Sequence, residues 1–182
     1  MQQSTVILVP GLGDSGPQHW QTLWQQHHPS FERVKQEDWD TPNCDDWVEV
    51  LQDAVQQYKP NQVVLVAHSL ACIAVTFWAQ KYKTSIKGAL LVAPADTEAA
   101  SFPKGVTGFA PIPMEKLPFK SVLVSSSNDS YISAKRAQQL ARAWGSQYVN
   151  LGLAGHINST SGYGRWDEGL ELLRSLCGTT RL

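Results

Sequence analysis

The sequence VVLVAHSLA, at residues 63–71, decides the fold that we predict for this chain. Its first five residues form a continuous apolar run, which is typical of a strand covered on both faces of a parallel sheet. Residues 70–82 are rich in alanine and larger apolar side chains and predict a helix. Ser69 therefore lies at a sharp strand-to-helix turn, where only small residues fit two positions before and two positions after it. Ala67 and Ala71 meet that requirement.

Two interpretations of Ser69 follow from this turn. A serine at the tip of a strand–turn–helix unit is a typical nucleophile, because the turn exposes its hydroxyl above the edge of the sheet. A serine that precedes a helix is also a common N-cap, whose hydroxyl accepts a backbone hydrogen bond. The usual nucleophile motif has glycine on both sides, whereas this chain has alanine at both positions, so the motif alone does not decide.

The rest of the chain alternates apolar runs with helical patterns, which predicts βαβ units and a parallel sheet. Strands are predicted at residues 5–9, 33–37, 63–67, 86–93, 121–125 and 147–151, and helices at 17–27, 45–58, 70–82, 134–144 and 166–177. Right-handed crossovers place such helices on both faces of the sheet. We therefore expect an α/β fold of three layers with about six mainly parallel strands, formed by residues 1–182 as a single domain.

Two residues further along the chain complete a candidate catalytic set with Ser69. A serine nucleophile needs a base, and the base needs a carboxylate that orients it. With this strand–turn–helix unit, the usual chain order is serine, acid, histidine. Asp129 follows the predicted strand at 121–125, and His156, the only histidine after Ser69, follows the last predicted strand. Because the carboxyl ends of parallel strands meet at one edge of a sheet, we expect the three side chains to lie together.

The assignment of the acid has alternatives. Asp129 also fits a turn or a capping aspartate, since a predicted helix begins at residue 134. The competing acids are Asp96, which follows another strand, and the more distant Asp38 and Asp40.

The loop after the first strand is the candidate second part of an oxyanion hole. The expected donors are the backbone amides of Leu12 in this loop and of Leu70, the residue after the nucleophile. Gly11 and Gly13 carry no side chain, so the backbone there can approach a substrate closely.

Residues 11–16 also fit the pattern G-x-G-x-x-G, which is typical of a dinucleotide-binding turn. Pro17 follows at once and lacks an amide that can face a phosphate. A dinucleotide site also leaves Asp129 and His156 unexplained, so this interpretation is the weaker one.

The composition excludes several classes of protein. The chain has 182 residues, of which 42% are hydrophobic, and its net charge of −1 argues against a nucleic-acid binder. No apolar run approaches the ~20 residues of a membrane span, and the N-terminus lacks the cationic segment of a signal peptide. The three cysteines have neither disulfide nor zinc-site spacing. We expect a cytoplasmic protein without metal, cofactor or membrane association.

Several motifs resemble those of a known family. The segment 155–158, Gly-His-Ile-Asn, continues to Ser-Gly-Tyr-Gly at 161–164 and to Trp166. Residues 38–42 and the His-Trp pair at 19–20 give weaker matches. With these motifs the chain resembles, over nearly its whole length, the small serine hydrolases of the α/β-hydrolase superfamily that include retinoblastoma-binding protein 9. The resemblance implies a hydrolase without a large cap domain and a triad of Ser69, Asp129 and His156, although Asp167 stands where the family often has proline.

The sequence is less decisive about the substrate. His19, Trp39 and Trp166, together with Gly11 and Gly13, are the candidate substrate-binding residues. The proline-rich segment at 94–118 either walls an acyl pocket or packs over the sheet edge. We expect a small acyl substrate, with ester cleavage as the reaction; a protein-binding module that keeps the triad is the alternative from another class, and its partner is unknown.

Overall fold

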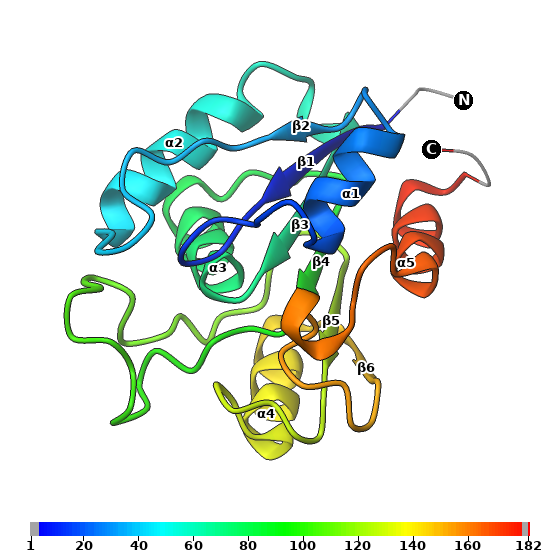
Figure 1. Cartoon of the computed structure of the whole chain (residues 1–182). Coiled ribbons are helices and arrows are strands. Elements are labelled where there is room, and N and C mark those ends of the chain that lie inside the picture. The colour runs from blue at the N-terminus through cyan, green and yellow to red at the C-terminus, as the bar shows by residue number, and fades with distance from the viewer. Residues whose placement is uncertain (1–3, 180–181) are drawn as a thin grey trace.

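The computed structural model describes residues 4–179 and 182, and in these residues six strands form one parallel sheet in the order β2-β1-β3-β4-β5-β6 (Figure 1). The strands are β1 (Thr5–Val9), β2 (Glu32–Arg33), β3 (Val63–His68), β4 (Gly88–Val92), β5 (Ser121–Ser125) and β6 (Gln147–Asn150). The helices are α1 (Trp20–His27), α2 (Cys44–Val55), α3 (Leu70–Tyr82), α4 (Ala134–Trp144) and α5 (Asp167–Cys177). None of these helices is both long enough and apolar enough to cross a membrane. The predicted α/β arrangement is confirmed.

Alternate residues of the strands face opposite helical layers, as the pleat of a strand requires. On β1, Ile7 and Val9 pack in a core that also contains residues of α2, α3 and α4. Val6 and Leu8, on the same strand, pack in a second core with residues of α1 and α5. Both faces of the sheet are therefore covered, which explains why the strand sequences are continuous apolar runs.

The second strand differs from the prediction. The sequence predicts a strand at 33–37, whereas β2 contains only Glu32 and Arg33. The amide of Val34 still donates to the carbonyl of Leu8. The next hydrogen bond between the two segments would come from the amide two residues after Leu8. That residue is Pro10, directly after β1, and proline has no N–H to donate. The pairing therefore ends there, and the chain leaves the sheet.

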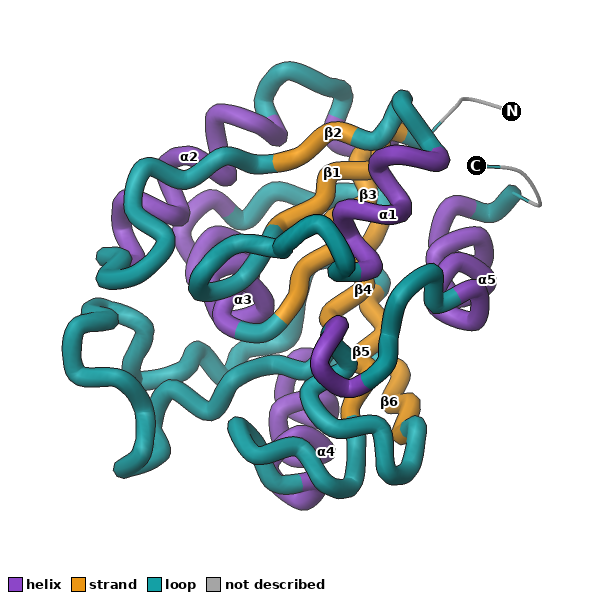
Figure 2. Tube along the Cα trace, in the orientation of Figure 1, coloured by secondary structure: helices purple, strands orange, loops and turns teal. Residues whose placement is uncertain are grey.

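The segment at 94–118 contains no helix, and it runs as a long loop between β4 and β5 (Figure 2). Val106, Phe109, Ile112 and Leu117 are buried in the core next to α2, α3 and α4. Phe102 and its neighbour Pro103 instead line a cavity at the carboxyl edge of the sheet. Most of the apolar side chains of the segment thus pack in the core, whereas the role of an acyl-pocket wall stays a prediction, and no cap domain is evident in the described chain.

The carboxyl ends of β1, β3 and β4 lie next to one another at one edge of the sheet. Val9 of β1 pairs with Ala67 of β3, and His68 of β3 pairs with Val92 of β4. The chain runs outward from β1 to β2 on one side and to β3 on the other. Such a switch point leaves a crevice beyond the strand ends, which is where α/β sheets bind ligands.

Candidate active site

Ser69 stands at the turn between β3 and α3 with a backbone that few residues adopt, φ 55° and ψ −122°. Its amide donates to the carbonyl of Val92 on the neighbouring strand (2.9 Å). Its side chain makes no capping hydrogen bond to α3, so the N-cap interpretation is wrong. The hydroxyl instead lies 2.8 Å from Nε2 of His156.

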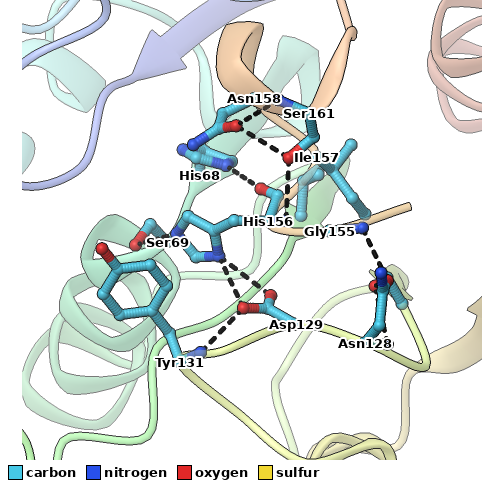
Figure 3. A network of polar contacts seen from close by, with 12 residues as sticks. His68, Ser69, Asn128, Asp129, Tyr131, Gly155, His156, Ile157, Asn158 and Ser161 are labelled. Carbon is cyan, nitrogen blue, oxygen red and sulfur yellow. Dashed lines mark hydrogen bonds and ion pairs between the residues drawn. The ribbon is translucent and has the colours of Figure 1, made fainter. Parts of the chain in front are cut away.

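His156 joins Ser69 to a buried carboxylate (Figure 3). Its Nδ1 lies 2.9 Å and 3.0 Å from the two carboxylate oxygens of Asp129, whose side chain has no exposed surface. A carboxylate only accepts, so Nδ1 carries the hydrogen and Nε2 is free to accept the proton of Ser69. The three residues predicted from strand ends are thus in contact in the required order.

The other acids lie elsewhere. Asp96 lies 3.6 Å from Arg136 in an ion pair and accepts the amide of Glu98. The exposed Asp38 accepts hydrogen bonds from the amide and the hydroxyl of Thr41 and from the amide of Asp40, and these bonds lower its pKa. Neither contacts His156.

Side chains from distant segments hold the loop that carries His156. Nε2–H of His68 donates to the carbonyl of His156 (2.9 Å), and Ser161 Oγ accepts the amide of His156 (3.1 Å). Asn128 accepts the amide of Gly155 (2.8 Å), and the indole of Trp20 donates to the carbonyl of Ile157 (2.9 Å). The histidine therefore has a fixed position although its loop is not part of the sheet.

The glycine loop after β1 packs directly against the turn at Ser69. A Cβ on Gly11 would lie 2.7 Å from the carbonyl oxygen of His68 and 3.0 Å from Cβ of Ser69, so only glycine fits there. Leu12 and Leu70 both line the cavity at Ser69. Within residues 4–179 neither amide has a hydrogen-bond partner, so both are available as the predicted oxyanion donors.

Gln21 is a buried side chain that holds this loop in place, and the sequence did not predict this role. Its Nε2 donates to the carbonyls of Val9 on β1 and Val66 on β3, and its Oε1 accepts the hydroxyl of Ser15. Arg33 adds contacts from β2, because its guanidinium donates to Asp14 and to the carbonyl of Ser15. Polar residues on a short amphipathic helix usually face solvent, so no sequence signal marked Gln21.

The same loop has little capacity left to bind a dinucleotide phosphate. The amide of Gly13 donates to the carbonyl of Trp39, and the amide of Asp14 donates to the carbonyl of Gly11. The amide of Ser15 donates to the carboxylate of Asp14. In a dinucleotide-binding loop such backbone amides point at the phosphate of the ligand. Here they are already paired, so the dinucleotide interpretation of the glycine motif is not supported.

The profile of the family described as serine hydrolase matches residues 6–175. The chain belongs to the serine hydrolase family. This confirms the family-level prediction and the α/β-hydrolase fold, while the more specific likeness to retinoblastoma-binding protein 9 stays a prediction.

Solved structures agree with this membership. A YdeN-like hydrolase from Pectobacterium atrosepticum is 34% identical, covers 97% of this chain and 92% of its own, and superposes with a TM-score of 0.85. The ydeN gene product of B. subtilis is 17% identical over 97% of this chain and 100% of its own, with a TM-score of 0.80. A thermophilic esterase from Thermogutta terrifontis shares the fold at 13% identity, a TM-score of 0.67 and coverage of 96% and 80%. No curated protein matches the chain.

The cavity at Ser69 has a volume of about 240 Å³ and two kinds of wall. The apolar wall consists of Leu12, Leu70, Ala95, Phe102 and Pro103. The polar wall includes Asp14, His19, Asn158 and Ser159. Among the residues that the structure describes, no group of three or more histidine, cysteine or acidic side chains is arranged to hold a metal ion.

Both tryptophans among the predicted substrate-binding residues lie outside this cavity. Trp39 is half-buried against Trp47 and contributes only its carbonyl to the glycine loop. Trp166 is buried between Trp20 and Trp24, with ring centroids 5.1 Å and 5.7 Å away. Aromatic side chains fill cores as readily as pockets, and the sequence does not distinguish the two.

The glycines and His19 have different positions. Gly11 and Gly13 shape the loop but do not line the cavity, whereas His19 does. Nδ1 of His19 caps α1 by accepting the amide of Gln21 (3.2 Å), so its Nε2 carries the hydrogen. That nitrogen has no hydrogen-bond partner in the described part of the chain.

Two histidines beside His156 are neutral. Burial, followed by repulsion from Arg33 and His156, lowers the pKa of His19 to about 4. Burial also lowers the pKa of His68 well below its usual value, with further contributions from His19 and His156. The cavity therefore keeps its polar groups without adding imidazolium charges near neutral pH.

The lowered pKa of His19 predicts how stability depends on pH. Below about pH 6.5 the unfolded chain takes up a proton that folded His19 takes up only near pH 4. The free energy of unfolding should therefore fall as the pH drops from about 6.5 to 4, by at most roughly 3 kcal/mol from this residue. His19→Asn keeps a capping side chain and should flatten this fall in urea titrations. Equal slopes for this variant, the wild type and the exposed-site control His27→Asn would contradict the prediction.

Proposed function

We propose that this protein is a hydrolase that cleaves a carboxylic ester, or a related acyl bond, of a small substrate through an acyl-enzyme. The observation that carries the proposal is the hydrogen-bonded chain from Ser69 Oγ through the imidazole of His156 to the buried carboxylate of Asp129. Ser69 and His156 both face the cavity, where a substrate carbonyl has room to bind.

In the first half of the proposed reaction, Ser69 Oγ attacks the carbonyl carbon while Nε2 of His156 takes the hydroxyl proton. The carbonyl oxygen becomes an oxyanion that accepts hydrogen bonds from the amides of Leu12 and Leu70. Asp129 stabilises the resulting imidazolium and holds its orientation. When the tetrahedral intermediate collapses, the bond to the leaving oxygen breaks, and His156 returns the proton to that oxygen.

In the second half, a water molecule replaces the leaving alcohol. His156 removes a proton from this water, and the hydroxide attacks the acyl carbon through the same oxyanion site. Collapse of the second intermediate releases the carboxylic acid, and the proton returns to Ser69 Oγ. His156 takes and returns one proton in each half, and water replaces the proton that leaves with the alcohol, so the proposed cycle needs no cofactor.

The test of the proposal is covalent labelling of Ser69. A fluorophosphonate probe should label the wild-type protein, and Ser69→Ala should abolish labelling and lower esterase activity by several orders of magnitude without unfolding the protein. Ser175→Ala, which changes an exposed serine on α5, serves as the control and should label normally. A wild-type protein that neither labels nor hydrolyses short p-nitrophenyl esters would favour the binding-module alternative.

The role of the acid has its own test. Asp129→Asn keeps the shape of the side chain but favours the histidine tautomer with hydrogen on Nε2, so kcat should fall by up to ~10⁴. Asp96→Asn is the matched control, because this carboxylate lies in an ion pair with Arg136. If the kcat of Asp129→Asn is near normal and that of Asp96→Asn falls strongly, Asp96 is the acid instead.

The size of the cavity predicts the acyl preference. A space of about 240 Å³ behind Phe102 and Pro103 holds a short acyl group, whereas a sixteen-carbon chain has to extend onto the surface. Esters of two to four carbons should therefore have the higher kcat/KM. Because the segment at 94–118 contains no helical lid, the rate should rise smoothly through the micelle concentration of the substrate. Faster turnover of the sixteen-carbon ester, or a jump in rate at micelle formation, would contradict this prediction.

A further inference from the structure

Tyr131 is a residue of the site that neither the sequence motifs nor the proposed reaction uses. It lies two residues after Asp129, and its ring centroid is 4.4 Å from that of His156, with the ring planes 43° apart. Tyr131 lines the cavity beside Ser69, and the residue is 54% exposed (Figure 3). A large aromatic side chain that is mostly exposed contributes little to a core, so its position over the histidine calls for another explanation.

The backbone on both sides of the ring is fixed. The amide of Tyr131 donates to Oδ1 of Asp129 (2.9 Å), and its carbonyl accepts the amide of Asp96 (3.1 Å). The phenol oxygen has no hydrogen-bond partner among the described residues. The contact with His156 therefore comes from the aromatic ring itself and not from its hydroxyl.

The face of an aromatic ring attracts a cation within about 6 Å of its centre. His156 becomes a cation when it takes the proton of Ser69, and the ring of Tyr131 lies inside that distance. Among the described residues, Asp129, His68 and His19 are titratable groups that interact with His156, and Asp14 lines the same cavity. His68 and His19 are neutral, and Asp96, which forms an ion pair with Arg136, contacts Tyr131 through its backbone amide.

We propose that the ring of Tyr131 is a positioning residue for His156, which it stabilises in the protonated form that acyl transfer creates. The proposal rests on the proposed hydrolase function. The ring covers one side of the imidazole, holds it between Ser69 and Asp129, and supplies an attraction that exists only while the proton is on the histidine. An interaction of this kind lowers the barrier, because it is stronger in the transition state than in the ground state.

Two variants separate the ring from its hydroxyl and from its bulk. Tyr131→Phe keeps the ring and should keep the wild-type kcat/KM on a short p-nitrophenyl ester. Tyr131→Leu keeps an apolar cover without a π face, and its kcat/KM at the plateau of the pH profile should fall by roughly twofold to fivefold. Its acid limb should also move about half a unit toward lower pH, because the imidazolium loses a stabilising contact and releases its proton sooner.

The pH profile is the deciding readout. A Tyr131→Leu profile whose acid limb does not move would overturn the proposal, even if the rate falls, because the side chain then only shapes the cavity. An equal fall of kcat/KM in Tyr131→Phe and Tyr131→Leu would overturn it as well, because the effect would then come from the hydroxyl and not from the ring. Thermal melting of both variants checks that they fold. Failure of the hydrolase function itself shows separately, as a wild-type protein that fails to react with ester or fluorophosphonate.

Discussion

The backbone of Ser69 has to adopt φ 55° and ψ −122°, and the rest of the site depends on this conformation. A non-glycine residue in such a region costs about 1–3 kcal/mol, so the surroundings have to hold it there. The buried strand β3 and the buried start of α3 fix both ends of the turn, and the amide of Ser69 bonds to Val92 of β4. In return, the hydroxyl is directed away from the helix and toward His156.

The crowding at this turn sets the residues around it. Ala67 and Ala71 are fully buried, and Gly11 lies so close that a single methyl group would overlap the carbonyl of His68. The close approach of Gly11 is also what brings Leu12 next to Leu70 at the cavity. One steric constraint thus shapes both the turn at Ser69 and the loop that carries the free amide of Leu12.

The loops that meet at the sheet edge are held by polar side chains, of which Gln21, His68 and Trp20 are buried and Asn128 is exposed. Gln21 joins the glycine loop to β1 and β3, His68 and Trp20 hold the carbonyls around His156, and Asn128 holds the amide of Gly155. A buried polar group that loses its partner costs about 1–3 kcal/mol. These contacts therefore hold the loops in place at the sheet edge.

The sequence by itself determined the α/β fold and the turn at Ser69, because both depend on local periodicity. It also determined that Ser69, Asp129 and His156 lie together, because parallel strands end at one edge of the sheet. It did not determine the short β2, since the missing N–H of Pro10 matters only once that residue is known to face β2. Tertiary structure alone decided that Trp166 packs against Trp20 and Trp24, that Gln21 is buried, and that the ring of Tyr131 lies over His156. The physical reason is that side-chain packing joins residues that lie apart in the sequence, such as Trp20 and Trp166, and such contacts leave no periodic signal along the chain.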